Sequence, residues 1–196
     1  MADIKNLLGY IATLLVFVSY IPYIRDVLSG KTKPHPYTWF LWSFITLIAF
    51  GLQFVGGAGS GSLVTLAAAI MCVVVLILTL LQKNKIEIVK KDIIFFIFAF
   101  IALGLWLIAK QPIISAILIT ATDFVAFFPT IRKSWNKPYS ETVLFYLLET
   151  FRFGLAIIAL QKYSIVTTLY PACWLTTEFL FALMLIYRRR QVSSHS

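Results

Sequence analysis

Four ionisable side chains stand inside long apolar stretches of this chain, and their types limit the chemistry that it can perform. Asp123, Glu149, Arg152 and Glu178 each lie several residues from the ends of their stretch. If the stretches cross a bilayer, a charge near its centre costs about 2.5 kcal/mol or more, so these groups face the protein interior, pair or line a watery path. They therefore predict a site that binds a polar solute, relays protons or does both.

Glu149 and Arg152 are three positions apart, so on a helix they share one face and can form a local ion pair. A purely structural pair is one interpretation. The other is that Arg152 receives the carboxylate of a substrate or another anion, while Glu149 holds the guanidinium between turnovers. The sequence leaves both interpretations open.

Asp123 and Glu178 have no basic residue nearby in their own stretches. Because a dry environment disfavours a charged carboxylate, an acid in a partly dry cavity can load and release a proton near neutral pH. Proton coupling is one hypothesis for these two acids. Neutral buried acids, or an ion pair shared with Arg152, are the others.

Aromatic side chains accompany two of the acids at helical spacing. Positions i, i+4, i+7 and i+8 of one stretch are Tyr170, Trp174, Thr177 and Glu178, and a similar stripe is Thr120, Asp123 and Phe127. Aromatic residues alone usually indicate packing between helices, but an acid on the same stripe disfavours a face turned to lipid. We therefore add Tyr170 and Trp174 to the predicted site.

The elements that position these residues are membrane helices. The 196 residues are 60% apolar and 13% charged, with a mean hydropathy of +0.89. This composition leaves no room for a water-soluble domain and excludes most soluble enzyme folds. The apolar runs are also about twice as long as the alternating strands of a membrane β-barrel. We predict an all-α membrane protein with seven transmembrane helices: Leu7 to Ile24, Tyr37 to Val55, Ser62 to Leu81, Ile93 to Ala109, Ile113 to Ile131, Thr142 to Leu160 and Ile165 to Tyr187.

The basic residues predict how the chain crosses the membrane. Thirteen of the 17 Lys and Arg residues follow the first, third, fifth and seventh stretches. Cytoplasmic loops carry an excess of positive charge, so we expect the N-terminus outside and the C-terminus in the cytoplasm, in an inner or plasma membrane. The net charge of +9 thus reflects topology, with attraction to anionic membrane lipids as a secondary effect, and no nucleic-acid surface is predicted.

An internal repeat links the two halves of the chain. The segment from Tyr20 to Arg25 returns 107 residues later, and the tripeptide from Pro36 returns 102 residues later. Ser62 to Thr65 also returns at the second spacing. We therefore expect two parallel three-helix repeats, residues 1–84 and 111–190, joined by a linker helix in residues 85–110 and followed by a tail, residues 191–196. The counterparts of the four ionisable residues in the first repeat are Val16, Leu47, Phe50 and Leu76.

A three-helix repeat with a proline near the inner end of its first helix, duplicated around a linker helix, resembles the PQ-loop superfamily, especially the SWEET and SemiSWEET sugar transporters. The resemblance covers nearly the whole chain and implies alternating access, in which the two units rock about a central cavity. The motif's glutamine is replaced by Tyr23 and Thr130, and Leu76 and Glu178 stand where sugar carriers present polar side chains. The family's tetrad of gate prolines maps onto Pro22, Pro36, Pro129 and Pro138.

Two local features remain ambiguous in sequence. Pro22 and Pro129 either bend their helices, because a proline removes one backbone hydrogen bond, or end them at the membrane interface. Trp39 and Trp42 stand near one end of their stretch, where an interfacial belt is the usual role of tryptophan. Closure of an inner gate is the alternative for these two residues.

The combined interpretation is a carrier that moves a small polar solute, amino-acid-like or a sugar, by alternating access, with or without proton coupling. The charged residues favour an ionisable solute over a neutral sugar. One alternative is a Pnu-like vitamin facilitator, since Trp39 and Trp42 are similar to the tryptophan motif of those carriers. A receptor of KDEL-receptor-like architecture is another. An intramembrane enzyme is disfavoured because no nucleophile, histidine and acid are grouped, and no cofactor or metal site is expected. Oligomerisation stays open.

Overall fold

The computed structural model describes residues 2–82 and 111–193 continuously, together with residues 89, 90, 93, 94, 96, 97, 101, 104 and 108. The predicted fourth span, Ile93 to Ala109, and the predicted linker, residues 85–110, therefore lie largely outside the described residues. Of this segment, Phe96 places its ring 4.5 Å from the ring of Tyr37.

The described part of the chain is helical and contains no strand. Five helices have bounds close to the predicted spans or beyond them. They are α1 (Ala2–Leu28), α2 (Pro36–Val55), α3 (Gly61–Leu81), α5 (Pro112–Asn136) and α7 (Ile165–Ser193). A short 3-10 turn, η1 (Pro138–Ser140), follows α5. The sixth helix, α6 (Val143–Ala159), is slightly shorter than its predicted span. The helix α7 runs three residues into the expected tail.

Local sequence explains where several helices begin and turn. Pro36 and Pro112 are the first residues of α2 and α5, a position where the missing N–H of proline costs nothing. Between α2 and α3 the chain reverses through Gly57 and Gly59, whose φ angles of 85° and 61° lie in the left-handed region. The connection between α2 and α3 is therefore a tight turn.

The helices are those of a multi-pass membrane protein. Five of them, all except α6, are long and apolar enough to cross a bilayer. The helix α6 has 17 residues, at the lower limit of a spanning length. Large apolar side chains are exposed along the outside of the bundle, among them Leu14, Leu47, Ile77 and Leu183. A surface of this kind suits lipid rather than water.

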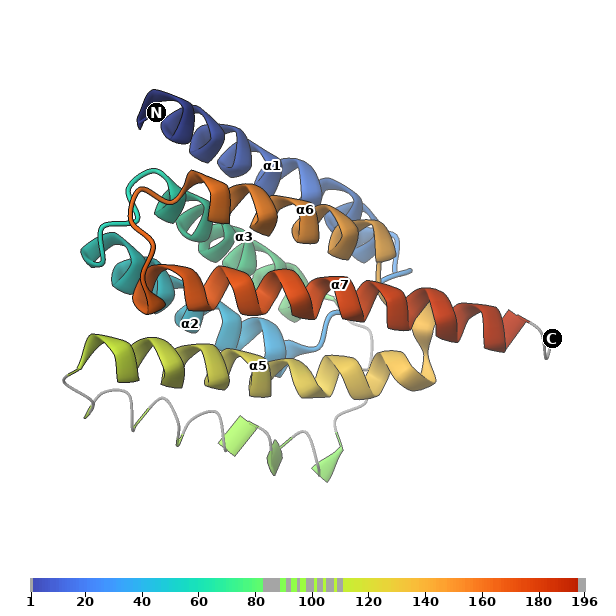
Figure 1. Cartoon of the computed structure of the whole chain (residues 1–196). Coiled ribbons are helices and arrows are strands. Elements are labelled where there is room, and N and C mark those ends of the chain that lie inside the picture. Colours follow the sequence, from blue (N-terminus) through green and yellow to red (C-terminus); the bar gives the residue numbers. More distant parts are fainter. Residues whose placement is uncertain are drawn as a thin grey trace.

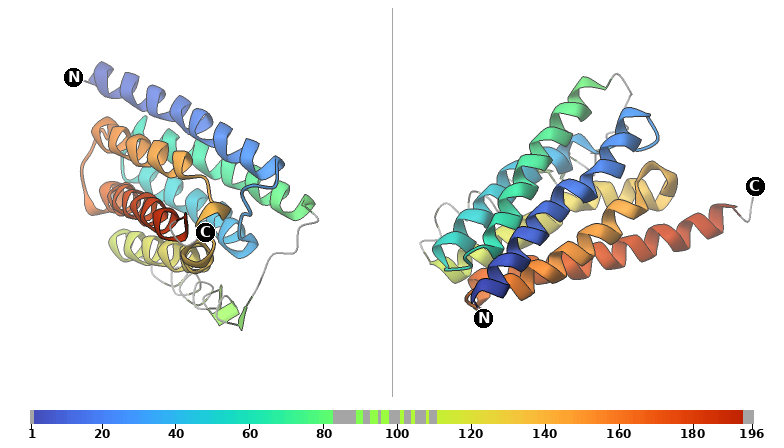
Figure 2. Two further views of the ribbon diagram at one scale, coloured as in Figure 1. Left: turned by 90° about the vertical axis from the view of Figure 1, so that its right-hand side faces the viewer. Right: turned by 90° about the horizontal axis from the view of Figure 1, so that it is seen from above.

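The six long helices pack as a closed ring (Figures 1 and 2). In spatial order, α1 contacts α3, α3 contacts α2, α2 contacts α5, α5 contacts α7, α7 contacts α6, and α6 contacts α1. The helices α1, α3, α5 and α7 run in one direction, and α2 and α6 run in the other (Figure 1). Arg25, Lys133 and Arg188 therefore lie at one end of the ring, which we call the basic end.

Two of the predicted gate prolines lie inside helices. Pro22 is six residues from the end of α1, and Pro129 is seven residues from the end of α5. The interpretation that these prolines end their helices at the interface is therefore wrong. Pro171, which the sequence did not single out, is a third interior proline, in α7. Pro36 and Pro138 instead begin α2 and η1.

Candidate functional site

A cavity lies in the middle of the helix ring and brings all four predicted ionisable residues together. The space in it that a water-sized molecule can occupy is small, about 30 Å³. Asp123, Glu149, Arg152 and Glu178 line it, and each is almost completely buried. Tyr170 and Trp174 line it as well, whereas Thr177 and Thr120 from the two predicted stripes do not. None of the four charged side chains faces the lipid side of the bundle.

Glu149 and Arg152 form the ion pair that their spacing predicts. The Nε atom of Arg152 donates to both carboxylate oxygens of Glu149 at 3.0 Å, and its Nη2 atom donates to Oε2. Ser19 of α1 donates its hydroxyl to the Oε1 atom of Glu149. The carboxylate is therefore satisfied on both oxygens, and the pair also connects α6 to α1. This geometry supports the structural interpretation of the pair.

Asp123 is held by a tyrosine on a neighbouring helix. The hydroxyl of Tyr170 donates to Oδ2 of Asp123 at 2.8 Å, and it lies 3.3 Å from the hydroxyl of Thr46. The main-chain oxygen of Asp123 accepts a hydrogen bond of 3.3 Å from the indole of Trp42. The residue thus joins α5 to both α2 and α7 through hydrogen bonds.

Several polar atoms on the cavity wall have no hydrogen-bond partner of normal geometry among the described residues. They are two carboxylate oxygens, one indole nitrogen and one guanidinium nitrogen: Asp123 Oδ1, Glu178 Oε2, Trp174 Nε1 and Arg152 Nη1. A buried polar atom without a partner costs about 1–3 kcal/mol. Four of them around one space indicate a site whose hydrogen bonds are completed by what enters it.

The structure corrects the repeat register for two of the helices. Leu47, the expected counterpart of Glu149, is 52% exposed, whereas its neighbour Thr46 is 4% exposed and lines the cavity. Likewise Val75 is fully buried, whereas Leu76 is only partly buried. The buried positions of α2 and α3 therefore correspond to the buried positions of α6 and α7 at a spacing of 103 residues, one more than the 102 of the sequence repeat. Val16 and Asp123 remain equivalent, since both are buried.

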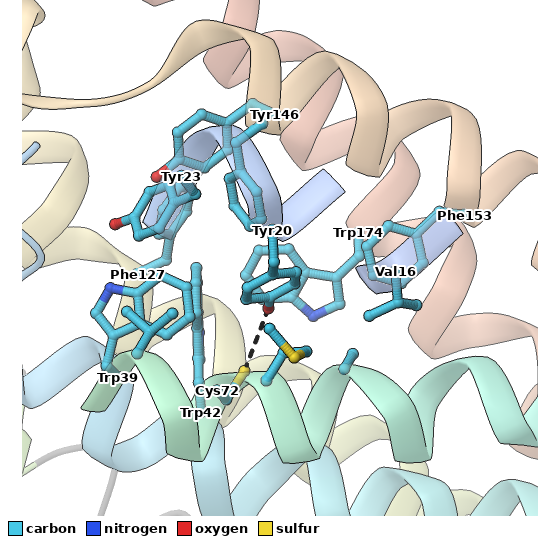
Figure 3. Close-up of a cluster of buried hydrophobic side chains, with 14 of the residues drawn as sticks. Val16, Tyr20, Tyr23, Trp39, Trp42, Cys72, Phe127, Tyr146, Phe153 and Trp174 are labelled. Atoms are coloured by element: carbon cyan, nitrogen blue, oxygen red, sulfur yellow. Dashed lines mark hydrogen bonds between the residues drawn. The ribbon is translucent and has the colours of Figure 1, made fainter. Parts of the chain in front are cut away.

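A closed circuit of aromatic rings borders the cavity; Figure 3 labels Tyr23, Trp39, Trp42, Phe127 and Tyr146 among its members. Neighbouring ring centroids around the circuit lie between 4.6 and 5.2 Å apart. We call this set the aromatic layer; in order around the circuit it comprises Trp39, Trp42, Phe127, Phe181, Tyr146, Phe145 and Tyr23. Trp39 and Trp42 are buried members, so the interpretation that they form an interfacial belt is wrong.

Beyond the aromatic layer, hydrogen bonds tie the two halves of the chain together at the basic end. Thr142 donates to Oδ2 of Asp26 at 3.0 Å, and its hydroxyl lies 2.6 Å from that of Thr32. The amide of Lys33 donates to the carbonyl of Ser140 at 3.1 Å. These bonds join the end of α1 and the loop after it to the segment that precedes α6.

Glu141 is the charged centre of the basic end. Its carboxylate accepts hydrogen bonds from Lys133 and, at 2.8 Å, from the hydroxyl of Tyr146. Lys133 also donates to the main-chain oxygen of Lys33, and Arg189 donates to the main-chain oxygen of Glu141. Together with the bonds of Asp26 and Thr142, these contacts form what we call the basic-end network. It ties α1, α5, α6 and α7 together at this end of the ring.

Sequence reasoning missed several residues of the site. Tyr20, Thr46, Thr65 and Cys72 line the cavity, and Tyr20 and Cys72 contact each other, with 3.6 Å between oxygen and sulfur (Figure 3). These residues have ordinary core or helix types, so their composition carries no signal. The available signal was helical phase, because Thr46 is one turn beyond Trp42 on α2.

Comparisons with protein-family models, with curated proteins and with solved structures find no match for this chain. Among the described residues, no three His, Cys, Asp or Glu side chains are gathered as metal ligands. The functional assignment therefore depends on the cavity itself.

Proposed function

We propose that this protein is a membrane carrier that moves a small polar solute by alternating access. The observation that supports the proposal most directly is the cavity: a buried space with charged and unpartnered polar groups, inside a ring of helices whose outside is apolar. A structural core would have no need of four charged side chains around a space that atoms leave open.

The contact order of the ring supports a duplicated architecture of three, one and three helices. Each contact between two of the six long helices has a counterpart when α1 is replaced by α5, α2 by α6 and α3 by α7, and the reverse. For example, the contact of α1 with α3 corresponds to that of α5 with α7. Residues 1–84 and 111–190 are the two repeats in this proposal, and residues 85–110 cross the membrane between them. An odd number of spans agrees with the two chain ends, which lie at opposite ends of the bundle (Figure 1). This architecture is that of SWEET-like and other PQ-loop carriers.

The basic-end network and the interior prolines support alternating access. Pro22 lies between Tyr20, on the cavity wall, and Tyr23, in the aromatic layer. Pro129 lies two residues beyond Phe127 of the same layer. Bending at these two positions would move the ends of α1 and α5 that carry Asp26 and Lys133, and so would open the basic-end network. With the N-terminus outside, that movement opens the cavity to the cytoplasm.

Uptake into liposomes tests the proposal. The full-length protein is reconstituted and offered amino acids, sugars and vitamins, each with and without a pH gradient. We expect saturable flux of at least one class of solute, and we expect Asp123→Asn and Glu178→Gln to abolish it. The control variant Asp3→Asn, which changes an exposed acid at the start of α1, should retain the flux. Flux equal to that of protein-free liposomes for every solute contradicts the carrier function. Saturable binding without flux would instead favour a receptor.

A further inference from the structure

The cavity has more acidic than basic groups once its internal pairing is taken into account. Three carboxyl groups and one guanidinium line it. Glu149 and Arg152 neutralise each other through three hydrogen bonds, so Asp123 and Glu178 remain. Among the described residues that line the cavity, neither of these acids has an ion-pair partner. A solute that carries a positive charge would supply the missing partner.

Both acids present an oxygen that is free to bind. Tyr170 occupies only Oδ2 of Asp123, and Oδ1 accepts no hydrogen bond of normal geometry, although the indole of Trp174 interacts with this carboxyl group. Oε2 of Glu178 has none either. A buried carboxylate is stable when it is paired and hydrogen-bonded, and an ammonium group provides up to three donors together with the charge. The free oxygens therefore suit a cationic nitrogen better than an anion.

The aromatic wall favours the same sign of charge. Trp42 and Trp174 meet edge to face with their ring centroids 5.2 Å apart, and Tyr20 and Tyr170 line the same space. The face of an aromatic ring carries partial negative charge, so it attracts a cation and repels an anion.

The cavity also contains two donors without a hydrogen bond of normal geometry. They are Trp174 Nε1, whose indole interacts with the Asp123 carboxyl group, and Arg152 Nη1. A ligand that satisfies them needs a hydroxyl or carboxyl oxygen in addition to its nitrogen. On the basis of the proposed carrier function, we propose that the cavity binds a solute with a positively charged nitrogen and an oxygen acceptor, an amino alcohol or an amino acid, with the nitrogen at Asp123 and Glu178.

Three probes that share a five-carbon chain with a hydroxyl group at one end test this proposal. They are 5-aminopentan-1-ol, pentane-1,5-diol and 5-hydroxypentanoate, whose other end is positively charged, neutral and negatively charged, respectively. Binding to the purified full-length protein in detergent is measured as the rise in unfolding temperature with probe concentration. We expect the amine to bind about tenfold or more tightly than the diol or the anion. Equal binding of amine and diol, or tightest binding of the anion, overturns the proposal.

The variants Asp123→Asn and Glu178→Gln remove each charge at nearly constant volume. We expect each to reduce the preference for the amine over the diol, while Asp3→Asn keeps it. Unchanged preference in both acid variants overturns the assignment of the nitrogen to these residues. If a variant does not fold, the ranking of the three probes on the unmodified protein still decides the charge class.

The same probes distinguish failure of this inference from failure of the carrier function. Flux of neutral solutes, without preferential binding of the amine, would support the carrier function and contradict the cation site. Tight binding of the amine, without flux into liposomes, would support the cation site and contradict the carrier function.

Discussion

Arg152 and Glu149 meet as a two-point ion pair one helical turn apart, with the Nε atom of Arg152 3.0 Å from both carboxylate oxygens of Glu149. Because both side chains are buried, removal of one partner leaves an unpaired charge, which typically costs about 3–5 kcal/mol. We expect Glu149→Leu to lower the unfolding temperature strongly, and the double variant Glu149→Leu/Arg152→Leu to lower it less. Thermal unfolding in detergent measures both. If the double variant loses as much thermal stability as the two single variants together, the two side chains do not stabilise each other.

The basic-end network should control access to the cavity from the basic end. Cys72 lines the cavity, and its reaction with a small water-soluble thiol reagent reports access once Cys173 is replaced by alanine. We expect Glu141→Gln to speed labelling of Cys72, because the ion pair of Glu141 with Lys133 is lost. Mass spectrometry follows the labelling. Asp3→Asn is the control. If Cys72 is labelled at the same rate in Glu141→Gln as in the protein with Glu141 intact, the basic-end network does not gate the cavity.

The interior prolines should matter for movement more than for stability. Replacement of Pro22 or Pro129 by alanine restores a backbone donor and favours a straight helix. We expect flux to fall several-fold while the unfolding temperature stays the same or rises. Pro36→Ala is the matched control, since a proline in the first turn of a helix bends nothing. Full flux in both interior variants would exclude these residues as hinges.

Gly59 should be required at the end opposite the basic end, where the turns of the two halves meet. The amide of Gln161 donates to the carbonyl of Ala58 at 3.2 Å, and a Cβ atom at Gly59 would lie 2.4 Å from Cγ of Gln161. Its φ of 61° adds strain for any other residue, so we expect Gly59→Ala to cost about 1–2 kcal/mol.

Gly51→Ala is the comparison for Gly59→Ala. Gly51 is in α2, and no heavy atom lies within 4 Å of a Cβ placed there. Helix propensity then predicts a gain of up to about 1 kcal/mol. Thermal unfolding of both variants measures the contrast. A Gly59→Ala protein as stable as Gly51→Ala would mean that the turn tolerates a side chain.

Residue types and the lengths of apolar runs were enough to predict the class of protein, the approximate position of its helices and the residues most expensive to bury. Each of these depends on how a side chain partitions between water and an apolar medium, which is a property of residue type and run length. Asp123, Glu149, Arg152 and Glu178 could be identified on that ground, and so could the ion pair, because its two members lie on one helix.

Which helices face one another, and in which register, could be read only from the packed helices. The contacts of Glu149 with Ser19 and of Asp123 with Tyr170 join residues that are far apart in the chain. Likewise, burial of Trp39 and selection of Thr46 over Leu47 follow from helix rotation. If a helix turns about its axis by the angle between successive residues, a side chain that faced lipid can face the cavity, although the sequence is unchanged. The contacts between helices therefore determine which residues line the cavity.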